Sequence, residues 1–427
     1  METETKKKFS YKWVMIALCF IMVGVSLGFC SSPGQLYISA ITNENALGFA
    51  RSAYAFTNTF RFVSTAIINL FFGTLIAKFG PKRLIFAGFT CLITANLIYS
   101  FASELWVFYI GGIFLGLGFS WTTTTMIGYV VNIWCRENKG TIMGAILASN
   151  GIFGAIAMKL IGYLINRNAD PFGYRDAYRI VVLILIAVAL LVLIFFKTSP
   201  NDTDTSNISK KKSRGRSWTG LEYSKTVKTA YFWLAIACVF LTGMTLQGVS
   251  GISSPHMEAV GLDKDYITTV LAIHSIALTF FKFIVGFLYD RFGLRVTTGI
   301  CYVTSALVMT ALVLLTNSPE GKVLAMFYGV FSSLALPLET IMLPIIAGDL
   351  FGERSFNKIL GIIVSANTAG YAVGSPLSNL CFDLTGSYSI SICIGISLIV
   401  IIMVIMQIII NRANRYHKEA EALDTAG

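Results

Sequence analysis

The sequence predicts an all-α membrane protein of twelve transmembrane helices, arranged as two pseudo-symmetric six-helix bundles. Of the 427 residues, 55% are hydrophobic and only 13% are charged, about half the charged fraction of a typical soluble domain. Twelve apolar segments reach the length of about 20 residues that a helix needs to cross a bilayer. In addition, sequence motifs of the first half recur in the second half.

The twelve predicted helices form two groups of six on either side of a polar linker. They are expected near 13–36, 53–77, 84–102, 105–132, 141–165, 177–197, 230–252, 266–289, 296–316, 322–347, 358–381 and 388–411. The segment 198–228 is polar, basic and poor in aliphatic residues, which is typical of a linker. We therefore expect an N-terminal bundle over 1–197 and a C-terminal bundle with a short tail over 229–427.

Two pairs of similar motifs relate the halves. GTLIAKFGPKR begins at Gly73 and GFLYDRFGLR begins 213 residues later at Gly286, each after the second helix of its half. GAILASN (144–150) and GIIVSAN (361–367) are 217 residues apart. Repeated halves of this kind are typical of transporters, whose substrate site lies near the bilayer midplane where the repeats meet.

The distribution of Lys and Arg predicts that both termini and the linker face the cytoplasm. In this orientation the cytoplasmic segments hold 24 of the 33 Lys and Arg residues, as the positive-inside rule requires. The net charge of +11 therefore indicates loops beside the cell membrane (plasma or inner), and no nucleic-acid partner is expected. The chain contains no Walker loop, HExxH or nucleophile elbow. We expect no enzymatic activity, no cofactor and no metal site.

The motif GxLxDRFGxR at 286–295, together with its counterpart after the second helix, resembles the loop signature of the major facilitator superfamily. With twelve helices and a basic central linker, the resemblance covers nearly the whole chain. It implies two bundles around a central cavity, alternating access by rocking of the bundles, and a monomer. In that family the signature Asp, here Asp290, helps to lock one state at the cytoplasmic side. Asp290 and Arg291 are thus gate candidates, whereas the first-half counterpart is Ala77.

Lys282 carries a narrower resemblance, to the monocarboxylate porter and oxalate–formate antiporter branch. That branch has an Arg on the eighth helix, eight residues before the signature Asp, and Lys282 has this spacing from Asp290. The sequence departs from the branch at Asn367, where the oxalate–formate antiporters carry a Lys. It also departs at Leu278, where the animal monocarboxylate porters carry an Asp. The resemblance implies transport of a small organic anion, such as a monocarboxylate, by proton symport or anion exchange.

Three ionisable residues within apolar segments are the main site candidates. A charge at the bilayer centre costs at least about 2.5–3.5 kcal/mol, so Lys282 and Arg61 need a compensating role. They would supply one cation from each bundle to a bound anion; the alternatives are snorkelling of Lys282 and a structural pair for Arg61. Glu339, between Pro337 and Pro344, is expected to take up the coupled proton, to pair with Lys282 in an empty site, or to form a purely structural pair.

Five further residues are secondary candidates. His274 could be a proton site near neutral pH or a hydrogen-bonded structural residue. Asn150 and Asn367 occupy equivalent positions of the repeat and could bind a carboxylate or join helices by hydrogen bonds. Trp121 could pack on a substrate and Thr122 could bond to it, although Thr hydroxyls commonly bond carbonyls of their own helix.

Two other functions compete with anion transport. In an exporter of drug-like or zwitterionic compounds, Glu339 would bind a cation. A transport-like ligand sensor would use the same cavity without net flux. The expected partners are a small organic anion, protons or a counter-anion, and the lipid bilayer.

Overall fold

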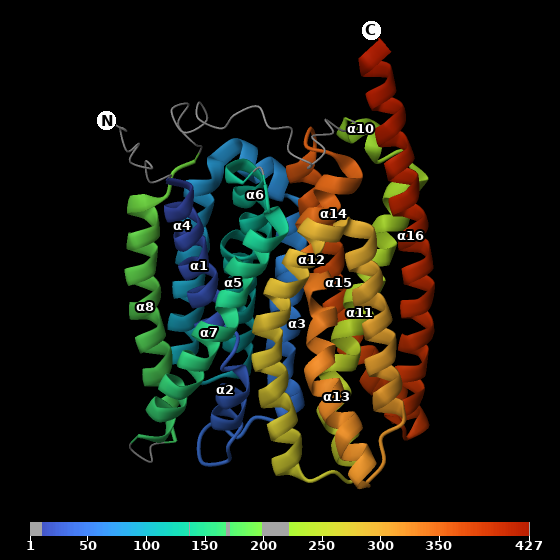
Figure 1. Cartoon of the computed structure of the whole chain (residues 1–427). Coiled ribbons are helices and arrows are strands. Elements are labelled where there is room, and N and C mark those ends of the chain that lie inside the picture. The colour runs from blue at the N-terminus through green and yellow to red at the C-terminus, as the bar shows by residue number, and fades with distance from the viewer. Residues whose placement is uncertain (1–10, 136, 168–170, 199–221, 427) are drawn as a thin grey trace, which may run out of the picture.

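The structure, a computed structural model, describes residues 11–135, 137–167, 171–198 and 222–426. In this part of the chain, upright helices stand side by side in two bundles (Figure 1), which confirms the predicted fold class. Nine helices of the described residues are long and apolar enough to cross a membrane. The predicted bundle boundaries stay a prediction, because residues 199–221 of the linker lie outside the described residues.

The first bundle consists of α1 (Tyr11–Cys30), α2 (Gly34–Ile41), α3 (Arg51–Leu70), α4 (Phe72–Phe101), α5 (Leu105–Thr122), α6 (Thr124–Trp134), α7 (Lys139–Asn166) and α8 (Gly173–Phe195). A short α10 (Tyr223–Thr226) precedes the second bundle. This consists of α11 (Ala230–Ala259), α12 (Lys264–Val313), α13 (Pro319–Ala335), the 3₁₀ turn η1 (Leu336–Glu339), α14 (Met342–Phe351), α15 (Phe356–Thr385) and α16 (Tyr388–Ala426).

Two of these helices each contain parts of two predicted spans. The backbone of α4 turns at Gly80 (φ 74°, ψ 164°), and that of α12 turns at Gly293 (φ 81°, ψ 176°). These dihedral angles lie in a region open essentially to glycine alone. Spans two and three, and spans eight and nine, are therefore each joined through a single glycine.

Besides a one-residue interruption at Phe71, between α3 and α4, three spans are interrupted within the apolar layer. Residues 31–33 separate α1 from α2, Thr123 separates α5 from α6, and η1 separates α13 from α14. Pro337 lies within η1 and Pro344 in the first turn of α14, and proline removes a donor from the helical hydrogen-bond ladder. Irregular backbone at membrane depth is tolerated where it is buried in protein or lines a cavity, so these breaks indicate where a site lies.

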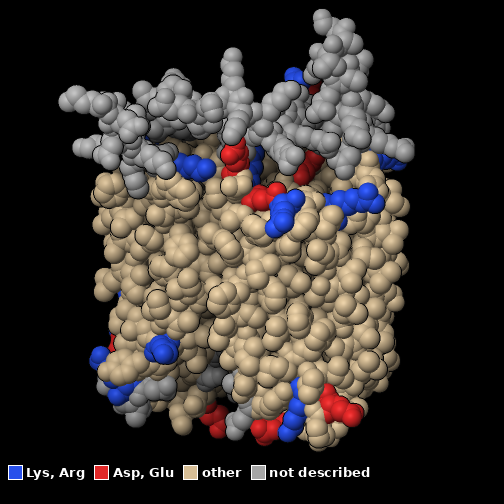
Figure 2. All heavy atoms as spheres, viewed as in Figure 1, with Lys and Arg blue, Asp and Glu red and all other residues tan. Residues whose placement is uncertain are grey.

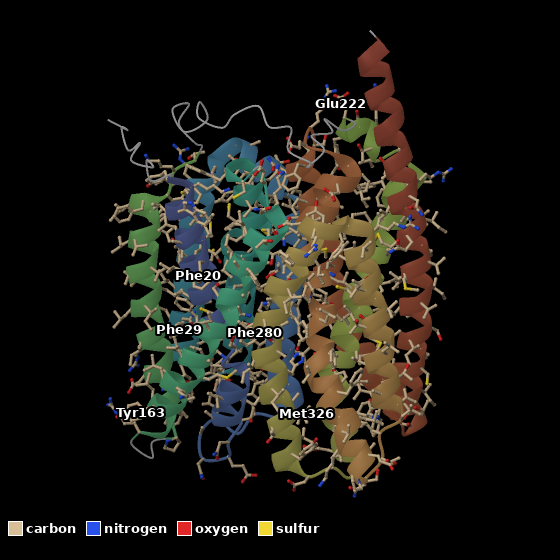
Figure 3. All side chains as sticks on the ribbon, viewed as in Figure 1. Phe20, Phe29, Tyr163, Glu222, Phe280 and Met326 are labelled. Atoms are coloured by element: carbon tan, nitrogen blue, oxygen red, sulfur yellow. The ribbon has the colours of Figure 1, made fainter. Side chains whose placement is uncertain are left out.

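The outer surface carries a broad apolar band. Lys, Arg, Asp and Glu side chains gather at the two edges of the molecule and leave an uncharged zone between them (Figure 2). Large apolar side chains of α8, such as Leu183 and Ile194, are exposed, as expected beside lipid. Glu222 lies near the upper end, Tyr163 near the lower end and Phe280 between them (Figure 3). The upper end, as drawn, is where α1 begins and α16 finishes.

The two bundles touch closely towards the upper end. A Cβ added to Gly140 of α7 would lie 2.5 Å from the carbonyl oxygen of Gly286 on α12. On the other side of the interface, a Cβ on Gly73 of α4 would lie 2.6 Å from Cα of Lys358 on α15. Glycine at both places therefore allows backbone to approach backbone.

Candidate functional site

Lys282 lies on α12 at the interface between the bundles, two residues after Phe280, which stands at mid-height (Figure 3). Its side chain is only 5% exposed. The ammonium Nζ donates a hydrogen bond to the carbonyl of Leu147, 3.3 Å away on α7 of the other bundle. No described carboxylate forms an ion pair with it. The side chain is thus buried between bundles and does not snorkel to an edge.

The ion pair that we expected between Lys282 and Glu339 is not formed in this structure. Lys282 is directed to α7, whereas Glu339 lies in η1, beside α15. The hydroxyl of Tyr371 on α15 donates to the main-chain carbonyl of Glu339 at 3.3 Å. Spacing along a helix gave the depth of each residue, but the direction of each side chain depends on how the helices pack.

Arg61 lies on α3 against the break between α1 and α2. Its Nη1 donates to Oγ of Ser31 at 3.3 Å, and its guanidinium lies 4.5 Å from the ring centre of Phe62 and 5.7 Å from that of Phe119. Cation–π contacts offset part of the cost of burying the charge. Among the described residues Arg61 has no acidic partner, and its Nε has no hydrogen-bond partner. The guanidinium therefore keeps donors for an anion.

A pair of aromatic rings connects the surroundings of Arg61 and Glu339 across the interface. The ring of Phe62 meets the ring of Tyr371 edge-on, with centres 5.6 Å apart and planes at 79°. Glu339 is 5% exposed, and its Oε1 has no hydrogen-bond partner among the described residues. The cation of the first bundle and the acid of the second are therefore linked through Phe62 and Tyr371.

The two asparagines of the repeat have different surroundings. Asn150 is partly exposed, and its Oδ1 accepts a hydrogen bond from Oγ of Ser32 at 3.1 Å, at the break after α1. Asn367 is 2% exposed, and its Nδ2 donates to the carbonyl of Val239 on α11 at 3.3 Å. Asn367 thus makes the interhelical bond that was the alternative to ligand binding, while Asn150 keeps an accessible amide.

Trp121 and Thr122 end α5, directly before the break at Thr123. The hydroxyl of Thr122 bonds the carbonyl of Gly118 at 2.9 Å, in its own helix, and Thr122 is fully buried. Thr122 therefore follows the alternative to substrate binding, in which a Thr hydroxyl bonds a carbonyl of its own helix. Trp121 is partly exposed, and its buried Nε1 has no hydrogen-bond partner in the described part of the chain. Trp121 thus keeps a free donor, and Thr122 does not.

His274 packs inside the second bundle, between α12 and α13. Its Nδ1 lies 3.1 Å from the carbonyl of Gly329 and 3.0 Å from each hydroxyl of Ser332 and Ser333. The Ser333 hydroxyl also donates to the carbonyl of His274 at 2.9 Å. So many partners fix the ring, which favours the structural role over proton coupling.

The gate candidates lie at the upper end. Oδ1 of Asp290 accepts from the backbone N of Gly140 at 3.0 Å, and Oδ2 accepts from that of Thr141 at 2.7 Å. A carboxylate of the second bundle thus caps the first turn of α7, where N–H groups lack partners and a negative charge is stabilised. Arg291 is exposed, and its guanidinium lies over the ring of Phe292 at 5.5 Å.

An ion pair also joins the two bundles at this end. Nζ of Lys139, at the start of α7, lies 3.4 Å from Oε1 of Glu353, between α14 and α15. Both side chains are substantially exposed, so the pair itself contributes little. We name the Gly140–Gly286 contact, the Asp290 cap and the Lys139–Glu353 pair together the upper closure.

Sequence reasoning missed four residues of this region. Ser31 and Ser32 had a signal, because the run SSPG combines the residue types that interrupt helices. Phe62 and Tyr371 had no such signal in the sequence, since aromatic residues also occur on lipid-facing and packed surfaces.

Comparison with known sequences identifies the family. The family model described as Major Facilitator Superfamily matches residues 45–255 and 235–425. An "Uncharacterized MFS-type transporter YcxA" of Bacillus subtilis (strain 168) is 21% identical over 393 residues, which cover 90% of this chain and 92% of that protein. A "Monocarboxylate transporter 13" of Bos taurus is 25% identical over 326 residues, covering 75% of this chain and 72% of that protein.

Solved structures agree on the fold. The transporter FucP in its outward conformation superposes with a TM-score of 0.70 at 15% identity, covering 93% of this chain and 99% of FucP. The proton:xylose symporter XylE superposes with a TM-score of 0.74 at 13% identity, covering 94% of this chain and 96% of XylE. Since the family model spans nearly all of the sequence and the fold agrees, this chain belongs to the Major Facilitator Superfamily and is a multi-pass membrane transporter.

Proposed function

We propose that this chain is a secondary active transporter of a small organic anion, with monocarboxylates as the first substrate class to test. The observation that carries the proposal is the pair of embedded cations, Arg61 and Lys282. One belongs to each bundle, and neither forms an ion pair with a described carboxylate. Burial of an unpaired charge costs several kcal/mol, which an anion bound between the bundles would offset. A 25% identical relative described as a monocarboxylate transporter supports the same class.

Glu339 is the proposed proton carrier. A carboxylate buried without a cation partner is more stable as the neutral acid, and Oε1 of Glu339 has no partner among the described residues. The contacts from Glu339 through Tyr371 and Phe62 to Arg61 give anion binding a route to alter the surroundings of the acid. Proton symport needs such a carrier, whereas exchange of one anion for another does not.

The upper end is the proposed cytoplasmic side, because the Lys and Arg bias puts it there. The upper closure then belongs to a state that is shut towards the cytoplasm, with Asp290 as a gate residue. In this state Lys282 bonds the carbonyl of Leu147 in the opposite bundle. Opening would break that bond, and a substrate carboxylate would replace the carbonyl as partner of the ammonium. Asn150 and Trp121 are proposed as neutral contacts for the same substrate.

Uptake of labelled lactate and pyruvate into proteoliposomes tests the proposal. The wild type should accumulate label when a proton gradient is imposed, or exchange it against preloaded unlabelled anion. Lys282→Gln should abolish both, and Lys282→Arg should keep part, because the charge remains while the planar guanidinium changes the geometry. Lys159→Gln is the matched control, since Lys159 is an exposed lysine of α7. Wild-type rates in Lys282→Gln would refute the proposal.

Export of a zwitterionic or drug-like compound is the second candidate, favoured by the unpaired oxygen of Glu339. In that case Glu339→Gln should abolish efflux of an organic cation. Lys282→Gln should leave that efflux unchanged.

A further inference from the structure

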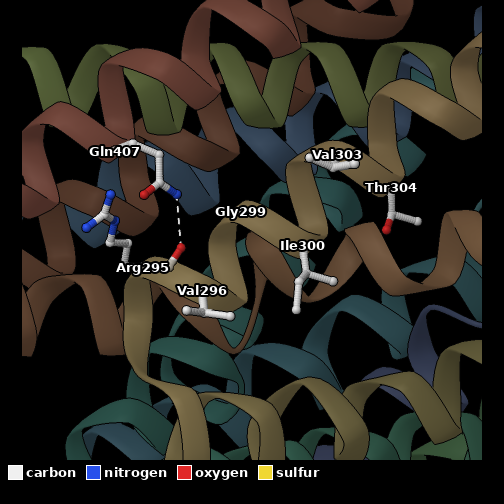
Figure 4. Close-up of a pocket in the computed structure, with 7 residues that line it drawn as sticks. All are labelled: Arg295, Val296, Gly299, Ile300, Val303, Thr304 and Gln407. Atoms are coloured by element: carbon white, nitrogen blue, oxygen red, sulfur yellow. Dashed lines mark hydrogen bonds between the residues drawn. The ribbon is translucent and has the colours of Figure 1, made fainter.

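A groove opens on the outer surface of the second bundle, between α16 and the part of α12 that follows Gly293 (Figure 4). Its volume is about 420 Å³. Arg295 and Gln407 stand at one end, and Val296, Ile300 and Val303 line it beside Gly299. The groove is separate from the interface between the bundles, where Arg61 and Lys282 lie.

The groove exists because Gly299 has no side chain. A Cβ at this position would meet only Nε2 of Gln407, at 3.3 Å. That nitrogen donates to the carbonyl of Arg295 at 2.9 Å and so ties α16 to α12 at this level. Val296 and Val303 are 46% and 47% exposed. The result is an apolar trough that faces outward, into the lipid layer.

The charge at the groove lies at one end only. Arg295 follows the turn at Gly293, at the upper edge of the apolar band, and its side chain is exposed. Arg412 lies five residues beyond Gln407 on α16, further towards the upper end, and is also exposed. Neither guanidinium forms an ion pair with a described carboxylate. A cationic end therefore continues into an apolar trough. This arrangement is complementary to an anionic phospholipid, in which a negatively charged headgroup is followed by apolar acyl chains.

We propose that this groove binds one anionic phospholipid of the upper leaflet. The headgroup phosphate pairs with Arg295, and one acyl chain lies along Val296, Gly299 and Val303. An anionic headgroup fits better than a zwitterionic one, because choline or ethanolamine would bring a further cation beside Arg295. Basic residues at the cytoplasmic surface attract anionic lipids in general, and here an adjoining trough adds a place for the chain.

Native mass spectrometry of the full-length, detergent-purified protein tests the site, with phosphatidylglycerol and phosphatidylcholine as probes. The wild type should retain one phosphatidylglycerol in preference to phosphatidylcholine. Arg295→Gln should weaken retention about fivefold, the factor that corresponds to one basic residue at a charged surface. Gly299→Leu should abolish retention although Arg295 is intact, because its side chain fills the trough and displaces only the flexible end of Gln407. Lys82→Gln is the matched control.

Lys82 is exposed and occupies the position of Arg295 in the first-half motif, so its replacement removes an equivalent charge from the other bundle. If Lys82→Gln lost as much lipid as Arg295→Gln, the effect would come from general surface charge. That result would overturn the proposed site. Retention unaffected by Gly299→Leu in a protein of wild-type thermal stability would do the same. Displacement of the lipid by millimolar inorganic phosphate would mean that Arg295 binds a free anion and not a lipid headgroup. A dimer that Gly299→Leu disrupts would assign the groove to a second copy of the chain.

Discussion

Replacing Gly140 by Ala tests the upper closure with a single methyl group. The added Cβ would lie 2.5 Å from the carbonyl oxygen of Gly286 and 2.6 Å from Cδ1 of Tyr289, below the 3.0 Å that real Cβ atoms respect. The upper ends of α7 and α12 must therefore move apart by several tenths of an ångström. Such overpacking typically costs about 1–3 kcal/mol, and here it falls on the closed state alone. The equilibrium should shift about 5- to 150-fold towards the open state.

Double electron–electron resonance measures this shift. Spin labels at Arg83 and Arg412, both exposed towards the upper end, report the distance between the bundles in a background without the native cysteines. Gly140→Ala should increase the long-distance population. The control is Gly162→Ala, also in α7, whose Cβ would meet Leu36 at an ordinary 3.7 Å. Identical distributions in the two variants would refute the reasoning. A lowered Tm with unchanged distances would mean that the cost falls on folding.

Other substitutions test the gate, the site and the orientation. Asp290→Asn keeps the shape of the side chain but removes its charge at the start of α7. The closed state should lose about 1 kcal/mol of stability, which shifts the same distance distribution about fivefold towards the open state. An unchanged distribution would exclude Asp290 as a gate residue. Arg61→Gln should raise KM for the anion about tenfold or more, because a hydrogen bond to a charged group is worth about 1.5–3 kcal/mol, and loss of folding would instead favour a structural role. Glu339→Gln should lose accumulation driven by a pH gradient yet keep anion exchange, and accumulation at the wild-type level would exclude Glu339 as the proton site. A cysteine introduced within 198–228 should resist an impermeant thiol reagent in intact cells, whereas rapid labelling would reverse the orientation.

The fold could be predicted because membrane insertion leaves a strong signal in sequence. Apolar runs of the required length and a repeat at a constant offset are both visible without any contact information. The breaks were only partly visible. Prolines predict the break around Glu339. The run of threonines around Thr123, in contrast, does not predict the irregular dihedral angles of that residue (φ −124°, ψ −141°). Such a break depends on neighbouring helices that satisfy the freed groups.

The site could be predicted by residue type but not by partner. Charges within apolar helices identified Arg61, Lys282 and Glu339, because their burial is costly enough to need a reason. The partners depend on rotamers and packing across the interface, which one sequence does not encode in a local pattern. Lys282 therefore faces the Leu147 carbonyl instead of Glu339, and an aromatic pair with no sequence signal connects Glu339 to Arg61.

The single-residue turns at Gly80 and Gly293 limit how this protein can be altered. A conventional loop tolerates added residues because its own entropy changes slowly with length, but here one residue reverses the chain between two helical arms that are held by their neighbours. Any other amino acid at these points would have to adopt a conformation that its Cβ resists. Epitope tags, fluorescent domains and crystallisation chaperones fused into this transporter should therefore be placed elsewhere. The same restriction applies to natural insertions in proteins that keep these two turns.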